Sequence, residues 1–129
     1  MKKRILIVED DQSSLYMLSF LLKSHDYEVY EAQDGLEGLK KAGQYKPDLI
    51  FLDVQMPEMD GFEVTKALKN NEELKHIPII ILTSFAMPGD KKKAMDAGAD
   101  GYIEKPINPE IFVSQMESMI KSYQAGFRF

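Results

Sequence analysis

Short apolar runs alternate with amphipathic stretches along most of the chain. The apolar runs lie at residues 5–8, 29–32, 49–52, 77–83 and 102–103. In the stretches between and after them, apolar side chains recur every three or four residues, as expected for one face of a helix. The pattern therefore predicts five strands, each followed by a helix.

The predicted helices are marked by apolar residues at helical spacing. The marker residues are Leu15, Leu18 and Leu22; Leu36 and Leu39; Val64 and Leu68; Ala94, Met95 and Ala99; and Phe112, Met116, Met119 and Tyr123. Turn-forming pairs such as Asp60-Gly61 separate the segments. We expect Asp90 and Asn108 to cap the fourth and fifth helices, with Pro109 at the first helical position.

Alternating strands and helices predict an α/β fold, a five-stranded parallel sheet with helices on both faces. The runs at 5–8, 49–52 and 79–82 are continuously apolar, which is typical of strands buried on both sides. The second run carries Glu28 and Glu31 and the fifth is short, so both are expected at the sheet edges.

Length and composition narrow the class of protein. The chain has 129 residues, enough for one domain, which we expect over residues 1–123 with a short tail over 124–129. A net charge of −5 disfavours nucleic-acid binding, because phosphate contacts need clustered Lys and Arg. Without cysteine, disulfides and thiolate metal sites are excluded. The apolar runs are too short to cross a membrane or to form a signal peptide, so we expect a cytoplasmic protein with no membrane partner.

Polar residues follow four of the predicted strands. Glu9-Asp10 follows the first, Asp53 the third and Lys105 the fifth, while Thr83 ends the fourth. In a sheet of the order 2-1-3-4-5 the first and third strands are neighbours, so Asp10, Asp53 and Glu9 converge. Ligands bind at this edge in open α/β sheets.

Such a cluster of acids favours a bound cation. At a separation of about 4 Å and an effective dielectric of about 20, each like-charged pair costs about 4 kcal/mol. An all-carboxylate set indicates a hard divalent ion, Mg²⁺ or Mn²⁺.

Carboxylate, metal and lysine together point to phosphoryl chemistry. A carboxylate can attack phosphorus and hold it as an aspartyl phosphate, while Lys105 and a metal neutralise phosphate oxygens. Asp53 is the best candidate nucleophile, because it stands alone at the end of a central strand. An Asp after a strand is commonly only a turn residue or a helix cap. The combination of acids, hydroxyl and amine on one edge is what favours chemistry.

Several segments together resemble the receiver domain of bacterial two-component response regulators. They read ILIVEDD at 5–11, DVQMPEMDG at 53–61, TSFA at 83–86 and AGADGY at 97–102, running into Lys105-Pro106. The resemblance covers the chain from about residue 3 to 123. With a single receiver, the chain is most similar to stand-alone regulators of the chemotaxis or DivK type.

The resemblance implies a role for each residue at the sheet edge. Asp53 would be phosphorylated, and Lys105 would bind the phosphoryl group. Asp10, Asp53 and the backbone carbonyl of Gln55 would ligate Mg²⁺ (or Mn²⁺) directly, with Glu9 acting through water.

The resemblance also implies a switch. Thr83 would be the switch hydroxyl and Tyr102 the switch aromatic, and phosphorylation would reshape the face formed by the fourth helix, fifth strand and fifth helix. The fold implied is the flavodoxin-like receiver fold of order 2-1-3-4-5, with a cis Lys105-Pro106 peptide. The simpler alternative to a switch role is that Tyr102 is an edge-strand aromatic, half-buried only for packing.

The implied partners are proteins. A sensor histidine kinase or a histidine phosphotransfer protein would donate the phosphoryl group, and a downstream protein target would read the switched face. The chain would be a monomer or a weak homodimer. It would not be an enzyme, apart from catalysing its own phosphorylation and dephosphorylation.

Two further features suggest roles of their own. Phe85 is expected to shield the phosphoryl group from water, and Lys91-Lys92-Lys93 could dock an acidic partner or be a solvated face.

Three alternatives stay open. A phosphatase of the haloacid-dehalogenase type also uses an Asp nucleophile and Mg²⁺, but normally carries a second Asp where this chain has Gln55. A receiver-like module could bind partners without phosphorylation. The chain could also be a receiver excised from a longer protein.

Overall fold

The carboxyl ends of five parallel strands lie at the same edge of one sheet. The computed structural model describes residues 2–84 and 89–124. Within these residues the strands are β1 (Arg4–Val8), β2 (Glu28–Ala32), β3 (Leu49–Asp53), β4 (Ile79–Thr83) and β5 (Gly101–Glu104). The helices are α1 (Gln12–Ser24), α2 (Gly35–Tyr45), α3 (Gly61–Lys69), α4 (Asp90–Ala97) and α5 (Phe112–Gln124). The strand order is β2-β1-β3-β4-β5, which confirms the predicted α/β fold.

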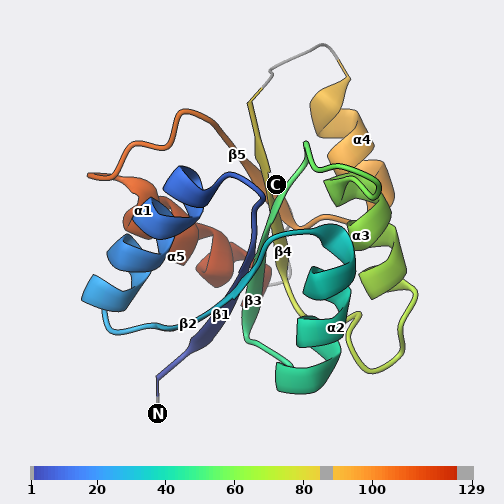
Figure 1. Cartoon of the computed structure of the whole chain (residues 1–129), viewed down its shortest axis with the longest axis horizontal. Helices are drawn as coiled ribbons and strands as arrows, with labels where there is room; N and C mark the ends of the chain where they lie inside the picture. Colours follow the sequence, from blue (N-terminus) through green and yellow to red (C-terminus); the bar gives the residue numbers. More distant parts are fainter. Residues whose placement is uncertain (1, 85–88, 125–129) are drawn as a thin grey trace.

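Helices cover both faces of the sheet. Figure 1 shows α1 and α5 on one face and α2, α3 and α4 on the other. Alternate residues of each strand face these two layers, as the pleat of a strand requires. In β1, Ile5 and Ile7 pack in the cluster with α1 and α5, whereas Leu6 and Val8 pack in the cluster with α2, α3 and α4.

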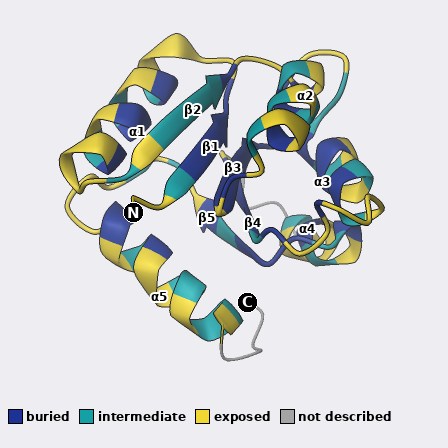
Figure 2. Ribbon diagram, turned by 90° about the horizontal axis from the view of Figure 1, so that it is seen from below, coloured by how far each residue is buried: buried dark blue, intermediate teal, exposed yellow. Residues whose placement is uncertain are grey.

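The central strands are buried from both sides. Every residue of β3 and of β4 is buried, and the helices keep their exposed sides outward (Figure 2). Covering one Ile or Leu side chain fully stabilises the fold by about 1.5–3 kcal/mol. The continuous apolar runs are therefore explained by burial on two faces.

The two predicted edge strands are at the edges. In β2 only Ala32 is buried, and in β5 only Gly101 and Ile103 are. Their mixture of charged and apolar residues follows from having one hydrogen-bonding side without a neighbouring strand.

The predicted caps of the last two helices are wrong in detail. The N-cap of α4 is Gly89, whose φ of 97° lies in the left-handed region that glycine tolerates, and Asp90 is the first helical residue. The Asn108 side chain accepts a hydrogen bond from the Glu110 N–H at 3.0 Å, but it caps a turn, and α5 begins only at Phe112. Pro109 therefore precedes the helix.

An aspartate side chain caps the amino end of each of the first three helices. The side chains of Asp11, Asp34 and Asp60 each accept a hydrogen bond from the backbone N–H three residues later. Such a cap stabilises a helix by about 1 kcal/mol. Asp60 is therefore a helix cap, which is the common structural role considered above for an Asp that follows a strand.

The apolar marker Leu36 is not in the core. Its exposed fraction is 63%, and α2 packs instead through Gly35, Gly38 and Ala42. A Cβ on Gly38 would lie 2.8 Å from Val8 Cγ2, so the helix approaches β1 too closely for a larger side chain. Backbone proximity, which periodicity does not reveal, decides which face of α2 is inside.

The fourth strand is shorter than the run 77–83 predicts. Ile77 is buried, but the strand begins at Ile79, after Pro78. Proline has no N–H for the ladder, although the Pro78 carbonyl accepts from the Ile50 N–H at 3.0 Å. Among residues 2–84 and 89–124, no helix has the length and hydrophobicity to cross a membrane.

Candidate functional site

The strand register places the polar residues of β3, β4 and β5 side by side. Asp53, the last residue of β3, pairs with Leu82, one residue before Thr83. Thr83 in turn pairs with Glu104, one residue before Lys105. The Lys105 N–H donates to the Thr83 carbonyl at 2.6 Å, which continues the ladder past the end of β5. The predicted edge is therefore formed by neighbouring strand ends.

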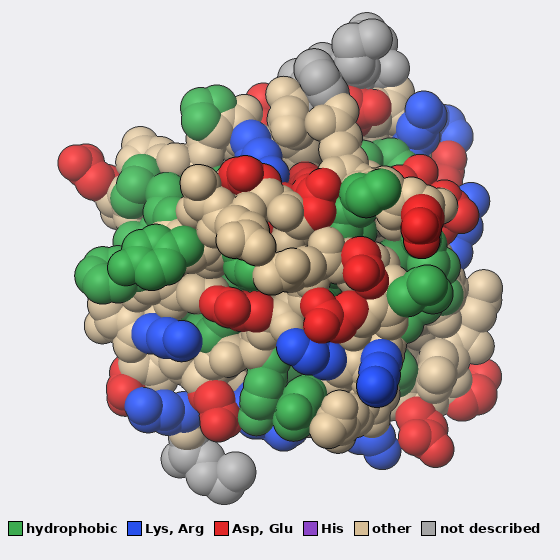
Figure 3. Space-filling view, in the orientation of Figure 1, with side chains coloured by type: hydrophobic (Ala, Val, Ile, Leu, Met, Phe, Trp, Pro, Cys, Tyr) green, Lys and Arg blue, Asp and Glu red, His purple; other side chains and the backbone are tan. Residues whose placement is uncertain are grey.

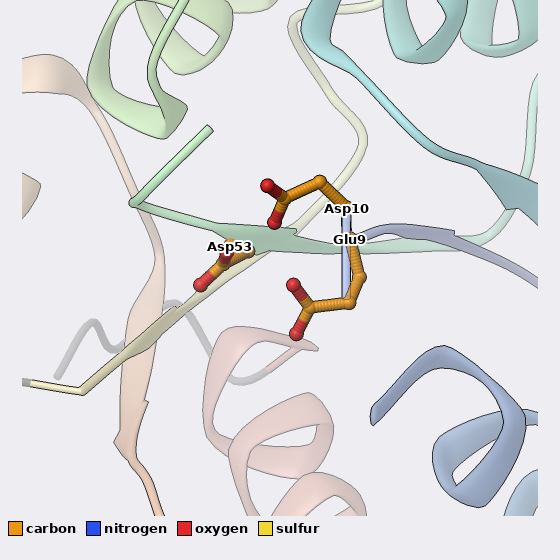
Figure 4. A group of neighbouring side chains, drawn as sticks. All are labelled: Glu9, Asp10 and Asp53. Atoms are coloured by element: carbon orange, nitrogen blue, oxygen red, sulfur yellow. The ribbon is translucent and has the colours of Figure 1, made fainter. Parts of the chain in front are cut away.

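Three carboxylates converge at this edge. One oxygen each of Glu9, Asp10 and Asp53 lies within 4.8 Å of the others. Figure 4 shows the carboxylates from the end of β1 and from the end of β3 turned toward a common space. Glu9 is 0% exposed and Asp53 3% exposed, whereas Asp10 is exposed.

Lys105 contacts two of the acids. Its Nζ donates to Glu9 Oε1 at 2.5 Å and lies 3.2 Å from Asp53 Oδ1. Sequence reasoning assigned Lys105 to a phosphoryl group and missed this ion pair, because a pairing over 96 residues leaves no local signal. The acid cluster is partly neutralised from within the chain.

The electrostatics follow from burial. Burial, followed by the neighbouring Glu9 carboxylate, raises the pKa of Asp53 to about 7, against the opposing effect of Lys105. Burial lowers the pKa of Lys105, but the hydrogen bond to Glu9 and the charge of Asp53 outweigh it, so the net shift is upward. A charged Asp53 is costly here unless a further cation joins the site.

The residues present fit a divalent cation. Asp53 Oδ1 is buried and accepts no hydrogen bond from the described residues. Three carboxylates and one ammonium leave two negative charges, which one Mg²⁺ balances. All the side-chain donors are oxygens, as Mg²⁺ and Mn²⁺ prefer. Gln55, two residues after β3, is exposed at the rim.

Gly61 holds the loop after β3 against Asp53. A Cβ on Gly61 would lie 2.5 Å from the Asp53 carbonyl oxygen, so a larger residue does not fit without a shift. The Gly61 N–H donates to the Val54 carbonyl at 3.1 Å. Asp60 and Glu63 form a capping box at the start of α3, which fixes where the loop ends.

The profile of the response regulator receiver domain matches residues 5–117. The chain belongs to this receiver family. It is of single-domain size and is close to DivK and CheY-like proteins.

Named relatives of this receiver span nearly its whole length. It is 41% identical to the polar-differentiation response regulator DivK of Brucella anthropi and 42% identical to that of Brucella ovis, over 93% of this chain and 98% of each relative. The structure of the chemotaxis protein CheY4 of Vibrio cholerae superposes with a TM-score of 0.88, at 37% identity, over 92% of this chain and 99% of that one. The receiver domain of a Pseudomonas aeruginosa sensor histidine kinase, described with a coordinated magnesium ion, superposes with a TM-score of 0.85 at 29% identity over 95% of this chain and 100% of that one.

The two predicted switch residues of this receiver face the same side of the sheet. Thr83 is buried at the end of β4, two residues after Ile81, which pairs with Tyr102 of β5. Tyr102 is half-buried and packs against the cluster on the α2–α4 side. The Lys105-Pro106 peptide is cis, as the resemblance implies.

The remaining predicted residues have simpler positions. Phe85 lies outside the described residues. Lys91, Lys92 and Lys93 are exposed on α4, and Lys92 Nζ pairs with Asp96 at 2.8 Å, one helical turn away. The exposure of these three lysines agrees with the interpretation of the run as a solvated helix face.

Proposed function

We propose that this receiver accepts a phosphoryl group from a phosphohistidine on Asp53, in a Mg²⁺-dependent reaction. The supporting observation is the setting of Asp53, a buried carboxylate at a strand end with Lys105 3.2 Å away and two further acids around a common space. A carboxylate held there by structure alone would be unfavourable, because burial raises its pKa.

The proposed transfer forms one bond to phosphorus and breaks another. An oxygen of the Asp53 carboxylate attacks the phosphorus, and the bond from phosphorus to the donor imidazole nitrogen breaks with its electron pair left on that nitrogen. Water later hydrolyses the acyl phosphate and returns the carboxylate and inorganic phosphate. Lys105 neutralises a phosphoryl oxygen, for which it shares or gives up its hydrogen bond to Glu9.

Mg²⁺, or Mn²⁺ in its place, is the proposed cofactor. Asp10, Asp53 and the Gln55 carbonyl would hold it directly, with Glu9 acting through water. When bound, the ion supplies positive charge that offsets the charge developing between the acceptor and the phosphoryl group.

Phosphorylation is proposed to shift a conformational equilibrium. The phosphoryl group adds about −1.5 to −2 charge to an already acidic site. The Thr83 hydroxyl then binds a phosphoryl oxygen, and Tyr102 rotates toward the space that Thr83 leaves. The face made by α4, β5 and α5 changes shape and gains affinity for a target.

The proposed partners follow from this chemistry. The donor is a sensor histidine kinase or a histidine phosphotransfer protein, the reader is a downstream protein, and the receiver is a cytoplasmic monomer or weak homodimer. Residues 1–123 are the proposed receiver unit and 124–129 its tail. The protein is a phosphoacceptor in signalling and catalyses only its own phosphorylation and dephosphorylation.

Intact mass after incubation with acetyl phosphate tests the proposal. We expect one phosphoryl adduct that needs Mg²⁺, is absent in Asp53→Asn, and is retained in Asp34→Asn, a matched change at a helix cap outside the cluster. If wild type forms no adduct and binds neither Mg²⁺ nor beryllofluoride, the proposal fails and a phosphorylation-independent interaction module replaces it. Turnover of a small phosphate ester would instead support the phosphatase alternative.

A further inference from the structure

The outer side of β2 is an open edge of the sheet. β2 pairs with β1 on one side, and within residues 2–84 and 89–124 no strand lies on its other side. Apart from Ala32, the residues of β2 are exposed or half-buried (Figure 2). An open edge offers unpaired N–H and C=O groups on which a strand of another molecule can form. The groups that face outward, and what contacts them, therefore decide whether this edge can pair.

The register fixes which backbone groups of β2 point outward. The Glu28 N–H at one end and the Ala32 carbonyl at the other both bond toward β1, each at 2.9 Å. Neighbouring residues of a strand direct their backbone groups to opposite sides, so Tyr30, midway, also faces β1. Val29 and Glu31 consequently direct their N–H and C=O groups to the open edge.

Lys41 of α2 occupies one of these outward groups. Its Nζ donates a hydrogen bond to the Glu31 carbonyl oxygen and lies 3.8 Å from Glu37 Oε2, one turn earlier in the helix. From α1, on the other face of the sheet, the Ser19 hydroxyl donates to Glu31 Oε2 at 2.5 Å. Glu31 is therefore held by both helices that flank the edge strand, and its outward carbonyl has an acceptor site already in use.

Edge-to-edge pairing of two copies would need the same carbonyl. Two β2 strands related by a twofold axis run antiparallel, and centring them on Tyr30 places Val29 of one copy opposite Glu31 of the other. Residues that face each other in this way exchange both N–H···O=C bonds. In each facing pair, one acceptor is the Glu31 carbonyl that Lys41 binds. Pairing and the Lys41 contact therefore compete.

We propose that Lys41 closes the edge of β2 against a second copy of this chain, and that removing its ammonium opens the edge to antiparallel pairing. The facing side chains favour this register, because Glu31 would lie opposite the uncharged Val29 and not opposite a like charge. The contact is thus an autoinhibitory one within a single chain. It does not depend on phosphorylation at Asp53.

Sedimentation velocity over a range of protein concentrations tests the proposal with Lys41→Met. We expect this variant to self-associate about tenfold more tightly than wild type, because the freed carbonyls gain hydrogen-bond partners. Lys40→Met is the matched control, since it removes the same charge from an exposed position one residue away in α2. If Lys41→Met associates no more tightly than Lys40→Met, the proposal is wrong.

A second substitution locates the contact. Val29→Pro removes an N–H that points away from β1, and proline is tolerated on an edge strand. Added to Lys41→Met, it should return association to the wild-type level, whereas association through any other surface would persist and would refute edge pairing.

Hydrogen exchange gives an independent readout for the same variants. In Lys41→Met the Val29 and Glu31 amides should exchange more slowly as protein concentration rises, because pairing buries them. In Lys40→Met their exchange should not depend on concentration. Self-association of Lys41→Met that leaves both amides unprotected would also overturn the proposal.

Discussion

Lys105 is the cation that pairs with the buried acids of this site. Its Nζ contacts Glu9 and lies 3.2 Å from Asp53. Removing one partner of a buried ion pair is costly, because the other charge stays in a low-dielectric environment. The proposed phosphoryl group on Asp53 would compete with Glu9 for the same ammonium. The residue proposed to bind phosphate therefore also keeps two buried acids compatible with a folded chain.

Lys105→Met is expected to lower the stability of the metal-free receiver by about 3 kcal/mol, since it leaves Glu9 and Asp53 buried without their cation. Urea denaturation at pH 7.5 measures the loss. Adding Mg²⁺ should restore part of it, because the metal supplies the missing positive charge. A loss that Mg²⁺ does not reduce would mean that Lys105 acts through packing of its side-chain stem.

In contrast to Lys105→Met, Asp53→Asn is expected to stabilise the receiver and to raise its Tm in the absence of metal. The pKa of Asp53 is about 7 in the folded protein and 3.8 in the unfolded chain. Between these values the folded state holds a proton that the unfolded state has released, so wild-type stability falls as pH rises through this window. At about 1.4 kcal/mol per pH unit, the gain from removing the charge is at most about 4 kcal/mol.

The pH dependence distinguishes this cause from a packing effect. The difference between Asp53→Asn and wild type should be near zero at pH 4, grow with pH, and level off above pH 7. Thermal melts over this range in chelator measure it. Asp10→Asn is the control, because Asp10 is exposed and water screens its repulsion, so its Tm should rise less. A pH-independent difference would contradict the buried-acid explanation.

At the scale of elements, close backbone approach positions the site. The loop after β3 is held by Gly61, where a side chain would collide with the Asp53 carbonyl, and by the Asp60–Glu63 capping box at the start of α3. The loop thus joins a rigid strand to a well-capped helix. The position of Asp53 depends on both ends.

Gly61→Ala is expected to destabilise the receiver by about 1–3 kcal/mol, because the new methyl must displace the backbone beside Asp53. It should also slow phosphorylation by acetyl phosphate, since the acceptor moves. Gly43→Ala in α2 is the matched control: nothing lies within 4 Å of its Cβ, and alanine there should add about 0.5–1 kcal/mol. Equal stability effects of the two variants would refute the role of Gly61.

Element boundaries show which local signals can be trusted. The apolar runs predicted all five strands. In β1, β3 and β4 the runs are continuous because burial on both faces requires apolar residues, whereas the runs of β2 and β5 are mixed or short because these strands lie at the edges. The helix marked by Leu36 and Leu39 is present, but Leu36 is exposed because α2 lies against β1 through Gly38. The prediction that Asp90 caps α4 is wrong, because Gly89 adopts the turn that precedes the helix.

At the scale of the whole molecule, one hydrophobic surface lies beside the acid cluster. Tyr16 and Phe20, one turn apart on α1, are 74% and 62% exposed, and hydrophobic side chains gather over this helix in Figure 3. The helix begins at Gln12, two residues after Asp10. The proposed phosphohistidine donor would approach Asp53 across neighbouring surface, and exposed apolar patches commonly mark contact sites.

Phe20→Ala is therefore expected to reduce kcat/KM for transfer from a phosphorylated histidine protein by about tenfold, which is the loss of about 1.4 kcal/mol of binding. Phosphorylation by acetyl phosphate, which needs no docking surface, should not change. Leu36→Ala, an equally exposed apolar residue on α2 at the other face of the sheet, is the control. A loss with both donors would show that Phe20 supports the site rather than the docking.

The sequence by itself determined the fold class, the strand count, the edge strands and the residues at the carboxyl edge of the sheet. These properties depend on composition and period, which reflect burial and turn chemistry within a few residues. The tertiary structure alone decided that Lys105 pairs with Glu9 and that Asp10 is exposed while Asp53 is buried. Those facts depend on contacts between strands and helices far apart in the chain, and the charge and pKa of Asp53 follow from them.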